Sequence, residues 1–165
     1  MQTEQSKLQQ QIKFLILFFV VSLIISGITA FPIQWEVNMM KKIVSHFDQQ
    51  GLAATWFNKI YEGITETNAK YPFIAYGTDW LAFAHIVIGI VFIGPLRDPV
   101  KNIWVIEFGM IACVLILPLA FICGPIRGIP FFWTLIDCSF GAIGIIPLYI
   151  CWKKIKQLEK FNAIH

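Results

Sequence analysis

Four ionisable residues stand within or at the edge of long apolar runs of this sequence: Asp79, His85, Glu107 and Asp137. A fifth, Arg127, lies in the short loop before the last run. A charged side chain at the centre of a membrane helix costs on the order of 2.5 to 3.5 kcal/mol on insertion scales, so each needs a partner or a role. His85 lies six residues after Asp79, where one apolar run begins. Asp137 lies seven residues after Pro130, where another begins. Two helices running in the same direction would therefore place His85 and Asp137 at about the same depth.

Small residues share a helical face with both of these side chains. They are Ala82 and Gly89 beside His85, and Gly141 and Gly144 beside Asp137. Such stripes let membrane helices approach closely and usually mark a contact surface. We predict that His85 and Asp137 point into a helical bundle, within reach of each other, and that Arg127 can reach down to Asp137.

Several roles for this predicted polar cluster stay open. It can be a structural clasp between helices, because one buried polar group often satisfies another. It can perform acid–base catalysis, with His85 as the base and Asp137 holding its tautomer. It can also form a path for protons or small solutes. Asp79, His85, Arg127 and Asp137 are the candidate ligand-binding residues, and Arg127 would bind a phosphate or carboxylate.

Other chemistries lack their sequence motifs. No local ligand spacing supports a metal site, and a bis-histidine haem would need a second buried histidine, so we expect neither metal nor haem. No two of the four cysteines, Cys113, Cys123, Cys138 and Cys151, are separated by two residues, which argues against thiol redox chemistry. A net charge of +3 from scattered basic residues does not suggest a nucleic-acid partner.

The composition predicts which elements position these residues. Hydrophobic residues make up 57% of the chain and charged residues only 14%, which is typical of an integral membrane protein. Apolar runs at about 14–31, 79–96, 103–122 and 130–152 are each long enough for a helix to cross a hydrocarbon core of ~30 Å. We predict an all-α, integral membrane four-helix bundle that forms a single membrane domain over residues 1–165.

The segment 32–78 is the only sizeable stretch outside these runs, and its apolar residues recur with helical spacing. One stripe contains Met39, Met40, Ile43, Val44 and Phe47, and the other contains Leu52, Trp56, Ile60 and Ile64. We predict an extracytoplasmic cap of two short amphipathic helices, separated at Gly51. Such helices lie on the bilayer surface or cover an outward-facing cavity.

The distribution of lysine and arginine predicts that both termini are cytoplasmic, because positively charged loops stay on that side. This orientation places eight of the thirteen basic residues inside: Lys7, Lys13, Arg97, Lys101, Lys153, Lys154, Lys156 and Lys160. The expected location is a bacterial inner membrane. A cleaved signal peptide is the alternative for the first apolar run, which follows a basic lead and ends near a small residue, Ala30.

The third span carries its own charge, Glu107, near the predicted cytoplasmic face. We expect Glu107 to pair with Arg97 or Lys101 in the preceding hairpin, and Asn102 to cap the span. Pro118 should kink this helix, and Gly124-Pro125 should end it.

These patterns specify a polytopic membrane protein with a buried polar cluster in its outer half. We predict a ligand-binding, transport-related or accessory membrane protein. The alternative is a small integral membrane enzyme that uses His85 and Asp137 for acid–base chemistry on a lipid or quinone-like substrate. Its partners would be membrane lipids and a hydrophobic or anionic small molecule, with a partner protein or a second copy of the chain left open.

Overall fold

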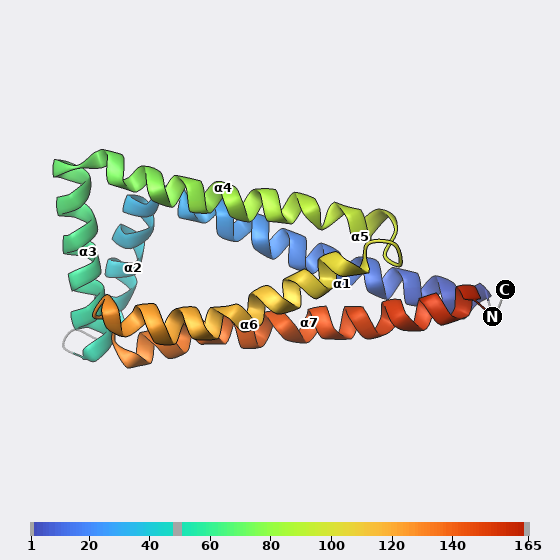
Figure 1. The fold of residues 1–165 in the computed structure, drawn as a ribbon. Coiled ribbons are helices and arrows are strands. Elements are labelled where there is room, and N and C mark those ends of the chain that lie inside the picture. The colour runs from blue at the N-terminus through green and yellow to red at the C-terminus, as the bar shows by residue number, and fades with distance from the viewer. Residues whose placement is uncertain (1, 48–50, 164–165) are drawn as a thin grey trace. The chain divides into compact units, whose positions relative to one another are not determined.

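The computed structural model describes residues 2–47 and 51–163, which are almost entirely helical (Figure 1). Its helices are α1 (Gln2–Ala30), α2 (Ile33–Phe47), α3 (Leu52–Lys70), η1 (Pro72–Ala75), α4 (Tyr76–Val91), α5 (Ile93–Arg97), α6 (Ile103–Ile126) and α7 (Phe131–Ala163). No strand occurs in the described ranges. The all-α prediction is confirmed.

Four stretches are long and apolar enough to cross a membrane: Glu4–Ala30, Pro72–Arg97, Ile103–Ile126 and Phe131–Ala163. They match the four spans predicted from the sequence, but the helices extend further. Helix α7 continues eleven residues beyond Trp152, to Ala163. The continuation contains four lysines together with one Gln, one Leu and one Glu, all of which favour helix, so the helix extends beyond the apolar run.

The apolar faces of these helices are largely uncovered. In each of these four stretches, only 22–28% of the most apolar 18 residues are buried within the protein. Large side chains such as Phe14, Phe131 and Ile143 keep 67–69% of their surface exposed. Continuous apolar surface of this size is rare on proteins that face water, so the four helices indicate a membrane protein.

The chain divides into two compact units, and each is described by itself. The terminal unit contains Met1–Ser22 and Gly89–His165, and the middle unit contains Leu23–Ile88. The boundary falls within α1 and α4, so each of these helices contributes to both units. The prediction of a single membrane domain stays a prediction.

Close backbone contact between α6 and α7 organises the terminal unit, where the two helices run side by side (Figure 1). Gly141 of α7 lies directly on the backbone carbonyl of Cys113 in α6. Further along, a Cβ atom at Gly109 would lie 3.0 Å from both Phe92 and Leu148. Glycine at these positions lets the two helices pack at short range, as small residues do in membrane interfaces.

The two ends of the chain also meet in the terminal unit (Figure 1). Leu8, Ile12, Ile16 and Val20 of α1 are buried at four-residue intervals, and Leu148, Cys151, Ile155 and Leu158 of α7 are buried at intervals of three or four residues. Gln5 donates a 3.1 Å hydrogen bond to Asn162, and Lys154 donates one of 2.7 Å to Gln11. The polar N-terminal stretch is therefore a packed helix. Signal-peptide cleavage would remove this part of the core.

The hairpin after α5 differs from the sequence prediction in one respect. Asn102 precedes α6 but makes no capping hydrogen bond to it. Its side-chain amide instead donates to the carbonyl groups of Gly94, at 3.2 Å, and Asp98, at 2.9 Å. The pKa of Asp98 is lowered, chiefly because its carboxylate accepts the Lys101 backbone N–H at 3.1 Å. Both carbonyls also accept a backbone N–H, from Asp98 and Asn102 respectively, so the Asn102 side chain adds a second donor at the end of the preceding helix.

The turn between α6 and α7 is a Schellman motif. The N–H of Ile129 donates to Gly124 at 2.9 Å, and that of Gly128 donates to Pro125 at 3.1 Å. Gly128 has φ = 67°, a conformation that glycine adopts without the steric penalty of a side chain. Helix α6 continues past Pro118 and Pro125 and ends at Ile126, so the predicted end at Gly124-Pro125 was wrong by one to two residues.

In the middle unit, α2 and α3 pack against each other (Figure 1). Gln34 donates a 3.0 Å hydrogen bond to Thr65, and the Lys41 ammonium lies 3.7 Å from the centre of the Tyr61 ring. The two helices predicted for 32–78 therefore exist, although the Phe47 side chain lies outside the described residues. Their placement as a cap on the outer face of a membrane stays a prediction.

We expect Gly141→Ala to lower the free energy of unfolding by ~1 to 3 kcal/mol, as overpacking typically does. The new methyl group would meet the backbone carbonyl of Cys113, which cannot rotate away. Thermal unfolding in detergent measures the change. Gly63→Ala is the control, because its Cβ would have no atom within 4 Å and alanine favours helix. Unchanged stability of Gly141→Ala would contradict the close helix contact.

Candidate functional site

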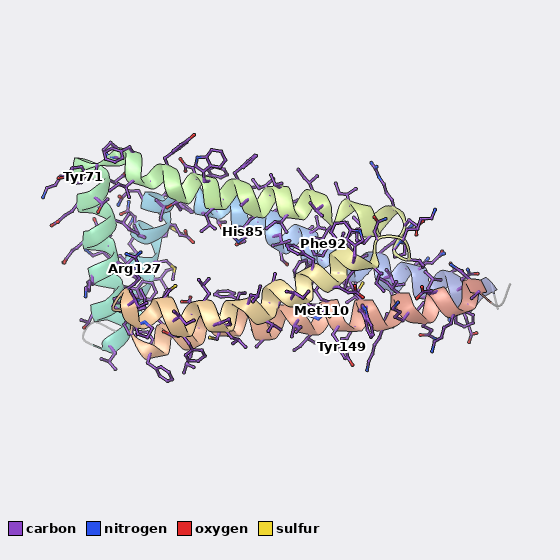
Figure 2. The ribbon with its side chains drawn as sticks, viewed as in Figure 1. Tyr71, His85, Phe92, Met110, Arg127 and Tyr149 are labelled. Atoms are coloured by element: carbon purple, nitrogen blue, oxygen red, sulfur yellow. The ribbon has the colours of Figure 1, made fainter. Side chains whose placement is uncertain are left out.

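The four candidate ligand-binding residues divide between the two units. Asp79 and His85 belong to α4 in the middle unit, whereas Arg127 and Asp137 belong to the terminal unit. His85 and Arg127 are labelled in Figure 2. The predicted meeting of His85 with Asp137 therefore stays a prediction. Each residue can be described within its own unit.

His85 is half-buried on α4, and its ring is fixed from within the same helix. Its Nδ1 atom lies 2.8 Å from the carbonyl oxygen of Leu81. A carbonyl oxygen only accepts, so Nδ1 carries the proton and Nε2 of the neutral ring keeps its lone pair. From the sequence we expected Asp137 to hold this tautomer. In the structure the Leu81 carbonyl accepts the Nδ1 hydrogen bond.

The small-residue face beside His85 is a helix contact, as predicted, and within the middle unit its partner is α1. A Cβ atom at Gly27 would lie 2.7 Å from the Ala82 carbonyl oxygen and 3.2 Å from Cβ of His85. Ala82 is completely buried. The close approach of Gly27 therefore places His85 at the edge of the contact between α1 and α4.

Asp79 is the acidic residue in the first turn of α4, directly after η1. The free N–H groups and the dipole at a helix N-terminus stabilise a negative charge there. The side chain is half-buried and lies two helical turns from His85. A carboxylate at this position can stabilise the helix N-terminus, and it can also contact a ligand.

Asp137 is half-buried in α7 and differs from three polar side chains of the spans that bond to their own helix. Ser22, Thr29 and Ser139 donate hydrogen bonds to the carbonyls of Phe18, Ile25 and Ile136 at 2.6–3.0 Å. Among the described residues of the terminal unit, no group donates a hydrogen bond to the Asp137 carboxylate, and no cation pairs with it. Asp137 is thus an intramembrane acid whose own unit leaves it unsatisfied.

The stripe that continues from Asp137 packs against α6. Gly141 lies on the Cys113 carbonyl, and a Cβ atom at Gly144 would lie 3.2 Å from the Cys113 sulfur. The prediction that this stripe is a contact surface is confirmed. The partner helix in the terminal unit is the third span, whereas the sequence reasoning had directed the stripe toward the second.

Arg127 follows α6 with its side chain exposed (Figure 2). Its backbone N–H donates to the carbonyls of Cys123 and Gly124 at 3.0 and 3.1 Å, which completes the helix end. No ion pair joins Arg127 to Asp137 among the described residues of the terminal unit. The expected contact between these two residues is therefore not present, and the guanidinium is open to a ligand or a lipid headgroup.

Glu107 has a partner that the sequence reasoning missed. The indole N–H of Trp152 in α7 donates to the Glu107 carboxylate at 3.0 Å. The expected partner Lys101 instead pairs with Asp98 at 3.4 Å. Because α6 and α7 are antiparallel, the start of one helix lies beside the end of the other, and this neighbourhood could have been derived from the predicted topology.

Comparisons with protein-family models, curated proteins and solved structures find no match for this chain. Within the described residues, no three His, Cys, Asp or Glu side chains are grouped so that they could hold a metal ion. All four cysteines are free thiols. The described side chains that could contact a ligand are the Asp137 carboxylate, which has no partner among the described residues of its own unit, the His85 ring with Nε2 free of its helix, and the exposed Arg127 guanidinium.

We expect Glu107→Leu to destabilise the protein by about 1 to 3 kcal/mol, because the Trp152 N–H would lose its acceptor in a partly buried setting. Glu107→Gln keeps an acceptor oxygen and serves as the matched control, with a smaller loss. Thermal unfolding of both variants, alone and combined with Trp152→Phe, gives the coupling between the two side chains. Equal losses for the Leu and Gln variants would show that the hydrogen bond does not matter.

Proposed function

We propose that this protein is a membrane-embedded binding protein, transport-related or accessory in role, whose ligand contacts centre on Asp137 and His85. The observation that carries the proposal is the half-buried Asp137 carboxylate, which has no hydrogen-bond partner among the described residues of its own unit. A carboxylate placed in a membrane helix without a partner costs several kcal/mol and tends to be functional. A bound ligand that donates a hydrogen bond would satisfy it.

His85 is the donor or co-ligand that this proposal favours. With its Nδ1 proton directed to Leu81, the imidazole presents Nε2 as an acceptor when neutral and as a donor when protonated. A ligand that donates a hydrogen bond would suit Asp137, and one that carries either a donor or an acceptor would suit His85. A direct clasp between the two side chains is the competing structural role.

The uncovered apolar surface supports an accessory role. Phe140, Ile143 and Ile146 on α7 are 57–67% exposed. Such faces can meet lipid, a partner protein or a second copy of this chain. We therefore include association within the membrane in the proposed function.

Asp137→Asn and His85→Gln test the ligand contact. We expect each variant to stay folded and to lose about 10- to 100-fold in affinity, as loss of a charged hydrogen bond predicts. The probes are a short-chain quinone, a lysophospholipid and Mg²⁺, each titrated against the detergent-purified protein with thermal unfolding as the readout. Ser139→Ala is the control, because its hydroxyl bonds only to the Ile136 carbonyl.

The outcomes separate the two roles. If one probe stabilises the wild type and the control but not the two variants, Asp137 and His85 bind that class of ligand. If no probe acts and both variants unfold at lower temperature, the residues form a structural clasp and the binding proposal is wrong.

An enzyme that uses acid–base chemistry on a lipid or quinone-like substrate is the second candidate. It is favoured by the hydrogen bond from His85 Nδ1 to Leu81, which leaves Nε2 as a base without help from a carboxylate. Turnover of a probe by the wild type, lost in His85→Gln, would favour this candidate over simple binding.

We also propose a bacterial inner membrane as the location, with both termini in the cytoplasm. An even number of spans requires both termini on one side, and the hydrogen bond between Gln5 and Asn162 supports their proximity. The clustering of lysines near these ends favours the cytoplasm.

Cysteine labelling tests this orientation. In a Cys123→Ser background the three remaining cysteines are buried, so an impermeant maleimide should label the parent poorly. We expect Arg127→Cys to react in intact cells and Lys160→Cys to react only after lysis. The reverse pattern would invert the topology, and equal labelling of both sites would contradict an even number of spans.

A further inference from the structure

A groove between α1 and α7 contains none of the candidate site residues and is lined by both basic and apolar side chains. It has a volume of about 430 Å³ and belongs entirely to the terminal unit. One part of its lining is polar and consists of Lys7, Gln10, Gln11 and Lys154. The other part is apolar and consists of Phe14, Leu15 and Ile150. We propose that this groove binds one anionic phospholipid.

The groove lies where both helices change from apolar to polar sequence. In α1 the change falls between Lys13 and Phe14, and in α7 it falls between Trp152 and Lys153. The 2.7 Å hydrogen bond from Lys154 to Gln11 shows that the two changes occur at the same level. This level corresponds to the boundary between headgroups and hydrocarbon, so the groove can hold a headgroup at one end and an acyl chain at the other.

The charge of the groove selects an anionic headgroup. Among the described residues, neither Lys7 nor Lys154 forms an ion pair with a carboxylate, whereas Lys156 nearby pairs with Glu159 at 3.0 Å. Lys154 donates one of its three hydrogens to the neutral amide oxygen of Gln11, which positions the ammonium without neutralising it. Two uncompensated cations at the headgroup level suit a lipid phosphate with net negative charge.

The apolar end suits an acyl chain. Phe14 is 69% exposed and lies at the start of a membrane-length apolar run. Together with Leu15 and Ile150 it forms a wall that water would not favour. A ligand with one anionic end and one apolar chain satisfies both parts of the groove, whereas free phosphate would satisfy only the polar part.

The test compares the affinity of the full-length, detergent-purified protein for phosphatidylglycerol and for phosphatidylcholine with the same chains, by native mass spectrometry. We expect the wild type to retain phosphatidylglycerol preferentially. The double variant Lys7→Gln/Lys154→Gln should bind it about 30-fold more weakly, since each lysine near the headgroup contributes about 1 kcal/mol. Lys13→Gln/Lys160→Gln removes the same charge outside the groove and should bind nearly as the wild type does.

A charge-preserving variant guards against misfolding. Lys7→Arg/Lys154→Arg should restore the preference for phosphatidylglycerol, because it returns both cations. The proposal is overturned if the two Gln double variants weaken lipid binding equally, because the lipid would then respond to the total positive charge and not to the groove. It is also overturned if inorganic phosphate displaces the lipid at equal concentration, or if the wild type does not distinguish the two lipids. None of these three results depends on Asp137 or His85, so this test is independent of the proposed function.

Discussion

Hydrocarbon offers no hydrogen-bond partners, and this constraint shapes the structure from its backbone to its polar side chains. The spans are helices because a helix satisfies its peptide groups internally. Side chains obey the same rule, since Ser22 and Thr29 bond to carbonyls of their own helix and Glu107 accepts the Trp152 indole N–H. Asp137 stands out against this background because the described part of the terminal unit offers it no donor.

Close approach between helices depends on a second consequence of the lipid environment. Apolar side chains gain little by leaving lipid for another apolar helix, so contact is strongest where small residues let backbones come together. Gly141 on the Cys113 carbonyl and Gly27 on the Ala82 carbonyl are two such places. Both lie beside the polar residues of interest, so the same packing that joins the helices also holds His85 and Asp137 in position.

The sequence predicted the spans well and the partners poorly. Four apolar runs were sufficient to locate four helices, because span length and hydropathy are local properties. The pairing of Glu107 with Lys101 was wrong, and Asn102 occupies the N-cap position of α6 without a side-chain hydrogen bond to that helix. In both cases the sequence reasoning chose a hydrogen-bond partner close to the polar residue in the chain. The structure assigned Glu107 to Trp152, 45 residues away.

Composition and hydropathy alone determined that the described residues are helical and include four membrane-length helices, and the sequence itself places the unusual charges at 79, 85, 107 and 137. Tertiary structure decided which faces meet: α7 on α6 through Gly141, α1 on α4 through Gly27, and the two chain ends through Gln5 and Asn162. The physical reason is that hydropathy acts residue by residue. Helix pairing depends on shape and hydrogen bonding between segments far apart in the chain, which no local pattern specifies.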